Sequence, residues 1–258
     1  MINGTEIEQN LQQIAEMLVL NGTLTECPGL VHGKMGIAVF FFHYAQHTSN
    51  ELFADYAMDV IGEMLNQIHV NSPADYEKGL AGIGVGIDYL IRNNFLDVED
   101  DICEDFDQRM VRAVMYDPWQ DFSQYNGLTG YGRYWITRLR YPAPSVQARE
   151  CLMRITALIE EKLLEISVEE QTDVYCFLHD LQEISGFEFC KSLLEQCRNW
   201  NLQSADMKGK MDMAFKQIPD LDMEKSPAGT GLLTGYAGEG MLRLTAINQT
   251  NRLWLNLL

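Results

Sequence analysis

A glycine-rich phrase recurs along this chain at nearly constant spacing, and each copy precedes an apolar, helix-like run. The copies occupy residues 29–38, 79–86, 127–134 and 231–240. The glycines taken as the starts of the apolar runs are Gly36, Gly84, Gly132 and Gly238. The steps between them are 48, 48 and 106 residues, and the last step equals two repeats of 53. A repeat of this length is typical of stacked supersecondary units.

Between the glycine phrases lie amphipathic segments with a helical period. In the first of them the apolar residues follow at steps of three or four, which is one face of a helix: Ile7, Leu11, Ile14 and Leu18. Similar segments cover residues 53–68, 102–114, 146–166 and 189–197. The runs after the phrases carry few charges, so we expect helices that other elements surround. The sequence therefore predicts an outer helix, a turn and an inner helix five times over, with almost no β-sheet.

The fourth unit departs from the repeat because its glycines are missing. Its inner helix is expected at residues 174–185, and residues 201–229 then interrupt the period as a long loop or a short irregular insertion. A structureless loop of that length in a compact domain is more often functional. We expect residues 1–258 to form one all-α domain, an α/α barrel (toroid) of about five outer/inner helix pairs that is complete, incomplete or open.

The net charge of the chain disfavours some classes of ligand and permits others. The chain has 37 acidic and 19 basic residues, a formal net charge of −18 and a pI near 4.5. This balance disfavours nucleic acid and anionic membrane surfaces, which attract basic patches. It permits a cationic ligand or peptide, although acidic faces also simply keep a protein soluble.

Targeting and redox features predict a reduced, cytoplasmic protein. The first ten residues lack the basic start and apolar stretch of a signal peptide. No apolar run approaches the roughly 20 residues that span a bilayer. The six cysteines are scattered and form no CxxC pair.

Glycine costs about 1 kcal/mol in a helix interior relative to alanine, so its repetition at helix starts needs a reason. One reason is that glycine reaches backbone angles that other residues avoid. Another is that it lets neighbouring inner helices approach closely. These two roles alone would explain the phrases. A functional alternative is that several inner-helix N-termini, each with unpaired N–H groups and a partial positive charge, point at one ligand.

Three segments resemble the repeats of lanthionine synthetase C-like (LanC-like) proteins: residues 30–38, 79–84 and 232–244. The resemblance covers roughly residues 5–247, and its most specific part is the His-Gly-x-x-Gly phrase that begins at His32. It implies an α/α toroid, in which GxxG turns lead into the inner ring, and a role in peptide modification. The family's closed toroid has more helix pairs than five, so the resemblance also allows a shortened, open or circularly offset relative.

The resemblance further implies a zinc ion in those members that are cyclases. Two cysteines and a histidine hold the metal, which activates a peptide cysteine thiol for addition to a dehydrated serine or threonine. The Trp-Cys-x-Gly and Cys-His-Gly phrases that carry the two cysteines do not occur in this sequence. The nearest remnant is Cys176 with His179, and two ligands are fewer than a catalytic zinc needs. The alternative is that both residues lie on a buried helix face.

The resemblance makes His32 the candidate catalytic residue, because it matches the family's proton-handling histidine. An unperturbed imidazole pKa of about 6.5 suits that work, and the alternative is a histidine bonded to a neighbouring turn. Lys34 either binds a carboxylate or is a solvated turn residue. Acidic residues at the turns either bind substrate, as one acid and one base of a glycosidase would, or cap helices: Asp75, Glu77, Asp117, Asp121 and Glu239. Residues that either line a peptide or sugar groove or pack at its edge are Tyr131, Arg133 and Tyr236.

The leading interpretation is a LanC-like protein in peptide modification, either a divergent cyclase or a non-catalytic member that holds a peptide or small-molecule ligand, and the missing zinc motifs favour the second. No cofactor is expected, and zinc would be expected only at an unrecognised cyclase site. The alternatives are a carbohydrate-active enzyme on an α/α barrel and a helical-repeat interaction module without chemistry. An open arrangement of five pairs would leave apolar inner helices uncovered, which predicts a homodimer.

Overall fold

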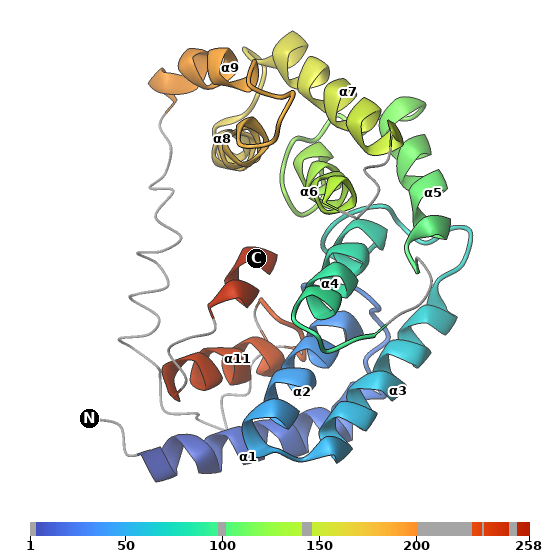
Figure 1. Ribbon diagram of the computed structural model, residues 1–258, viewed down its shortest axis with the longest axis vertical. Helices are drawn as coiled ribbons and strands as arrows, with labels where there is room; N and C mark the ends of the chain where they lie inside the picture. The colour runs from blue at the N-terminus through green and yellow to red at the C-terminus, as the bar shows by residue number, and fades with distance from the viewer. Residues whose placement is uncertain (1–3, 98–101, 141–145, 201–228, 234, 248–251) are drawn as a thin grey trace. The chain divides into compact units, whose positions relative to one another are not determined.

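The protein is described by a computed structural model (Figure 1), which covers residues 4–97, 102–140, 146–200, 229–233, 235–247 and 252–258. All regular structure in these ranges is helical, so the all-α prediction is confirmed for them. No described helix is both long enough and apolar enough to cross a membrane. The predicted insertion at residues 201–229 lies outside the described residues except for Gly229.

The alternation of two kinds of helix is also confirmed. One-sided amphipathic helices are α1 (Gly4–Gly22), α3 (Glu51–Gln67), α5 (Glu104–Met115), α7 (Val146–Lys162) and α9 (Cys190–Gln196). The helices that alternate with them are α2 (Lys34–Thr48), α4 (Leu80–Arg92), α6 (Leu128–Leu139), α8 (Val168–Gln182) and α11 (Tyr236–Ile247). Two short 3-10 helices complete the set, η1 (Cys197–Asn199) and η3 (Leu253–Leu257). Helices α2, α4, α6 and α11 are buried on nearly all sides, whereas α8 buries one face.

Contacts between residues divide the chain into two compact units. The first contains residues 1–73, 77–97 and 209–258, and the second contains residues 74–76 and 98–208. Helices α1 to α4, α11 and η3 therefore belong to the first unit, and α5 to α9 with η1 belong to the second. Each unit is described by itself, and the single domain predicted from the sequence stays a prediction.

The first unit is organised around α2. This helix packs against α3 and α11, and α11 also packs against α1, as Figure 1 shows. An aromatic cluster joins α2 to α3, in which the ring of Phe41 lies 4.7 Å from that of Tyr56 and 6.0 Å from that of Phe53. The last buried helix of the chain thus packs against the first amphipathic helix, as α2 packs against α3.

The second unit centres on α6, which packs against α7 and α8, while α5 packs against α7. A buried ion pair joins α5 to α6, with Arg138 Nη2 located 2.7 Å from Asp107 Oδ2. The hydroxyl of Tyr134 also donates to Asp107, so the buried carboxylate has several donors. This satisfied network is required because an unpaired buried charge would cost several kcal/mol, on the order of 3–5.

Four of the buried helices begin with the same backbone hydrogen bond. The first amide of the helix donates to the carbonyl seven residues earlier, so each loop folds back over the start of its own helix. The bonds run from Lys34 N to Cys27 O (2.9 Å), Leu80 N to Pro73 O (3.0 Å), Leu128 N to Asp121 O (2.8 Å) and Tyr236 N to Gly229 O (3.1 Å). The first amides of a helix have no acceptor within it. The loops supply that acceptor, so the prediction of unpaired N–H groups is wrong for these four amides.

The buried helices begin earlier than the sequence predicted. Three of them start directly after Gly33, Gly79 and Gly127, so the glycines taken as run starts lie two to four residues inside the helices. Helix α8, which lacks a glycine phrase, starts six residues before the predicted 174. Its first turn is stabilised by a capping box, in which Ser167 N donates to Glu170 Oε2 over 3.0 Å.

Close approach explains the glycines, and unusual backbone angles do not. The φ angles of Gly33, Gly79 and Gly127 are −135°, −108° and −112°, which are extended values open to any residue. A Cβ atom on Gly33 would lie 2.3 Å from the carbonyl oxygen of Cys27, and one on Gly130 would lie 2.1 Å from that of Gln124. The predicted role of glycine in turn conformation is therefore wrong at the three helix starts.

A second set of glycines receives side chains from the neighbouring buried helix. A Cβ on Gly240 of α11 would lie 2.3 Å from the ring of Phe40 of α2. A Cβ on Gly132 of α6 would lie 2.2 Å from the ring of Phe177 of α8. The prediction that glycine lets buried helices approach one another is confirmed at these positions.

Replacing Gly130 by alanine should test the folding of loop on helix. We expect Gly130→Ala to destabilise the protein by about 1–3 kcal/mol, because the added methyl group would overlap a carbonyl oxygen. Gly62→Ala is the matched control, since Gly62 is exposed in α3 and no atom lies within 4 Å of its Cβ position. This control should gain about 1 kcal/mol from helix propensity. Urea denaturation measures both, and equal effects would contradict the packing described.

Burial of His43 makes the stability of the first unit depend on pH. The imidazole of this α2 residue is 7% exposed, and its Nε2 lies 2.7 Å from the hydroxyl of Tyr89. Burial lowers the pKa of His43 from 6.5 to about 4. Between these two values the unfolded chain binds the proton and the folded chain does not. Acidification through this window therefore favours unfolding.

We expect His43 to contribute a loss of about 3 kcal/mol in the free energy of unfolding between pH 6.5 and pH 4. His43→Gln removes the titrating group, so its difference from the native chain should change with pH over this range. His47→Gln is the control, because His47 is located on the same helix but contacts the exposed Glu8. A constant difference between His43→Gln and the native chain would contradict the burial effect.

Candidate functional site

The predicted residues His32 and Glu77 are brought together in the first unit. Imidazole Nε2 of His32 lies 3.2 Å from Oε1 of Glu77, and the two side chains are 36% and 19% exposed. The backbone positions them, because Val31 N donates to the carbonyl of Glu77 over 3.2 Å. The loops before α2 and α4 therefore hold an imidazole and a carboxylate in contact.

This pair has the geometry of a proton-transfer dyad. A carboxylate that accepts a hydrogen bond from one ring nitrogen orients the imidazole. Nδ1 of His32 has no hydrogen-bond partner among the described residues, and the side chain is partly exposed. The ammonium of Lys78, located 3.3 Å from Glu77 Oε1, shares the same carboxylate. The same contact also fits the alternative that His32 only bonds to a neighbouring turn.

Lys34 is buried and does not lie in solvent. Its Nζ lies 2.7 Å from Oε2 of Glu63 on α3, and its side chain is 3% exposed. The solvated alternative is therefore wrong. A role of Lys34 in ligand binding stays a prediction, and its ammonium already has a carboxylate partner.

The predicted residues of α11 belong to the start of that helix. Tyr236 is its first residue, is buried, and donates its backbone amide to Gly229. Glu239 pairs with the buried guanidinium of Arg243 one turn later. Both side chains thus have structural contacts in the first unit.

In the second unit the charges of three carboxylates act on the phenol of Tyr131. Burial and, in decreasing order, the charges of Asp75, Asp121 and Asp117 together raise the pKa of Tyr131 to about 12. The Asp121 carboxylate also accepts the backbone amide of Ser123 over 2.7 Å and so stabilises its own loop, whereas the start of α6 has no side-chain cap. The cluster is a negative site beside a half-exposed loop.

The guanidinium of Arg133 lies over the ring of Tyr76, 5.7 Å from its centroid. Burial raises the pKa of Asp173 on α8 above its ordinary value of 3.8, and the charge of Arg133 partly opposes this shift. Oδ2 of Asp173 accepts the amide of Gln124 over 2.8 Å. Asp121 and Glu170 add negative charge near the same carboxyl group. Arg133 therefore joins a group of titratable residues that the sequence prediction did not include.

The signal for Asp173 was present but weak. It is an acidic residue on a helix that alternates with amphipathic ones, where the other repeats carry glycine and apolar residues. The missing glycines of the fourth unit obscured that position.

The remnant of a zinc site is not assembled as a ligand set. Cys176 is half-buried, and burial raises the pKa of its thiol. His179 is exposed, and its ring stacks on Tyr175. Across the described residues no three His, Cys, Asp or Glu side chains come close enough to hold a metal ion.

Comparisons with known proteins give no relative for this chain: no family model, no curated protein and no solved structure matches it. The LanC-like resemblance therefore stays a prediction from the sequence phrases.

Proposed function

We propose that the chain is a LanC-like protein that binds a peptide and has no zinc-dependent cyclase activity. The observation that carries this proposal is the contact between His32 and Glu77. The histidine belongs to the His-Gly-x-x-Gly phrase, and its Nδ1 has no hydrogen-bond partner among the described residues. It can donate a hydrogen bond to a peptide carbonyl or exchange a proton with a peptide side chain.

The proposed arrangement of the helices is an α/α toroid. Its support is the packing of α11 on α1, which repeats the relation of α2 to α3 and brings the last helix of the chain to the first. In a ring of helix pairs, a contact between the last pair and the first pair closes the ring.

The proposed peptide carries basic side chains. The chain has a net charge of −18, and Glu77 in one unit and the carboxylates around Tyr131 in the other provide negative sites on the loops. Such sites attract cations over distances of a Debye length, about 10 Å at moderate salt. Binding should therefore weaken as salt is added.

A labelled peptide that contains Cys and Ser, made in basic, neutral and acidic versions, tests the proposal by fluorescence anisotropy. We expect the basic version to bind most tightly and His32→Ala to weaken it about tenfold, the effect of losing one hydrogen bond of about 1.4 kcal/mol. Elemental analysis should give less than one zinc ion per chain.

The matched control is His47→Ala, because His47 forms the same kind of contact with Glu8 at the other end of α2. If no version binds, the peptide proposal is wrong. If both variants bind like the native chain, the protein is a helical-repeat interaction module whose binding does not use His32. Stoichiometric zinc would restore the cyclase.

Asp173 favours a second candidate function, a carbohydrate-active enzyme. A glycosidase needs one carboxyl group that holds a proton beside one that is ionised. Burial raises the pKa of Asp173, and Asp121 lies near enough to raise it further. In this alternative Asp173 is the general acid and Asp121 the base or nucleophile.

Asp173→Asn separates this candidate from a structural role. Hydrolysis of aryl glycosides should fall by about 10²–10⁴ in the variant if Asp173 is the acid. The same variant should be more stable than the native chain at neutral pH, because a carboxyl group with a raised pKa loses its stabilising effect as pH rises through that pKa. Asp180→Asn, a change at an exposed carboxyl group of the same helix, is the control. A native chain without glycosidase activity would contradict the candidate, whatever the effect on stability.

The homodimer and the cytoplasmic location stay proposals. All six cysteines are free thiols, which suits a reducing compartment. Sedimentation velocity at micromolar concentration measures the oligomeric state directly.

A further inference from the structure

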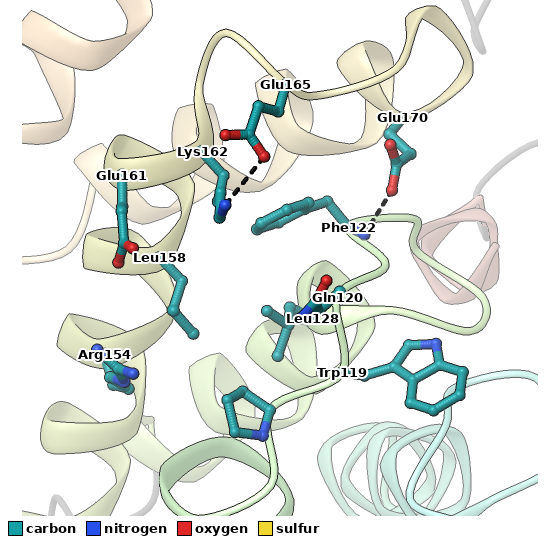
Figure 2. Close-up of a pocket in the computed structure, with 11 residues that line it drawn as sticks. Trp119, Gln120, Phe122, Leu128, Arg154, Leu158, Glu161, Lys162, Glu165 and Glu170 are labelled. Carbon is teal, nitrogen blue, oxygen red and sulfur yellow. Dashed lines mark hydrogen bonds and ion pairs between the residues drawn. The ribbon is translucent and has the colours of Figure 1, made fainter.

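A cavity of about 290 Å³ lies in the second unit, between α7 and the loop that leads into α6 (Figure 2). None of its lining residues was among the predicted site residues, although the predicted Asp121 belongs to the same loop. Its apolar wall is formed by Pro118, Phe122, Leu128 and Leu158. The indole of Trp119, which is 61% exposed, stands at one side of the opening.

The loop side of this cavity is held in place by hydrogen bonds. Phe122 N donates to Glu170 Oε1 over 2.7 Å, and its carbonyl accepts the hydroxyl of Thr129 over 2.9 Å. Leu128 N closes the loop on Asp121. The aromatic wall is therefore formed before any ligand arrives, which lowers the cost of binding.

The helix side of the cavity is one face of α7. Arg154, Leu158, Glu161 and Lys162 follow at steps that place them on the same side of a helix. Figure 2 shows Leu158 directed toward the loop, with Arg154 and Glu161 on either side of it along the helix.

Some charged side chains at the cavity have a partner among the described residues and others do not. Lys162 Nζ lies 2.9 Å from Glu165 Oε2, and both Glu165 and Glu161 raise the pKa of Lys162. Glu170 is occupied by backbone amides. Neither Arg154 nor Glu161 has a hydrogen bond or ion pair within the described part of the chain. Arg154 is thus the cation at the cavity that lacks a carboxylate partner in those ranges.

We propose that this cavity binds a small aromatic monocarboxylate. The ring occupies the space between Phe122, Leu128 and Leu158 beside the indole of Trp119. The carboxylate pairs with Arg154, whose planar fork suits two parallel hydrogen bonds. The volume lies at the lower end of the range for ligand pockets, so the ligand is small. This inference does not depend on the proposed peptide function, because it uses other residues and a ligand of opposite charge.

Three matched probes test the assignment: 3-phenylpropionate, its neutral amide, and phenethylamine. Binding is followed by the shift of the Trp119 indole N–H signal in two-dimensional NMR, with Trp119→Phe to assign it. We expect 3-phenylpropionate to bind with a Kd on the order of 1 mM, and the amide and the amine to bind at least about tenfold more weakly.

Arg154→Gln should weaken 3-phenylpropionate about tenfold and leave the amide unchanged. Arg198→Gln is the control, because Arg198 belongs to the same unit and pairs with Glu195 on the surface. Leu158→Phe, which fills the cavity, should abolish binding of all three probes. Equal binding of acid and amide, preference for the amine, or no shift at millimolar probe would each overturn the proposal.

Discussion

One kind of backbone hydrogen bond, found at the starts of four buried helices, fixes the loops of this protein on those helices. The first amide of a buried helix donates to the carbonyl seven residues earlier, and this happens at Lys34, Leu80, Leu128 and Tyr236. Because the bond requires the loop to lie directly on the helix start, no side chain fits at Gly33, Gly127 or Gly235. The loop residues are then fixed relative to the helix, and so are the side chains that they carry. The contact of His32 with Glu77 is one result. The rigid wall at Phe122 is another.

The same bond decides what kind of chemistry the loops can offer. Helix N-termini bind anions when their first amides are open. Here a carbonyl takes the first amide, so the helix ends give less positive charge to a ligand than their number suggested. Side chains must supply the charge instead, and on the loops these are mostly acidic: Asp75, Glu77, Asp117 and Asp121. A ligand for these loops should therefore be a cation, and a ligand anion needs a separate place with its own guanidinium.

The order of helices could be predicted from the sequence because apolar periodicity and glycine spacing are local signals. The starts of the helices could not, since the capping bond joins residues across a loop and leaves no mark in composition. The pairing of His32 with Glu77 was also beyond prediction, because it depends on two loops more than forty residues apart lying side by side. Asp173 was missed for a different reason. A capping box at Ser167 replaces the glycine phrase there, and α8 starts before the predicted segment. The cavity beside Arg154 arises from α7, which the sequence marked only as an outer amphipathic helix.

The net charge of −18 does not act evenly over the molecule. Around Tyr131 three carboxylates add to one another and raise the pKa of a buried phenol, so a nearby cation would be stabilised by all of them. At the cavity beside α7, Glu165 pairs with Lys162 and Glu170 accepts backbone amides, so Arg154 is the cation there that lacks a carboxylate partner among the described residues. Local pairing thus leaves a guanidinium available although the overall composition is acidic. The two proposed sites therefore differ in the charge of the ligand they accept.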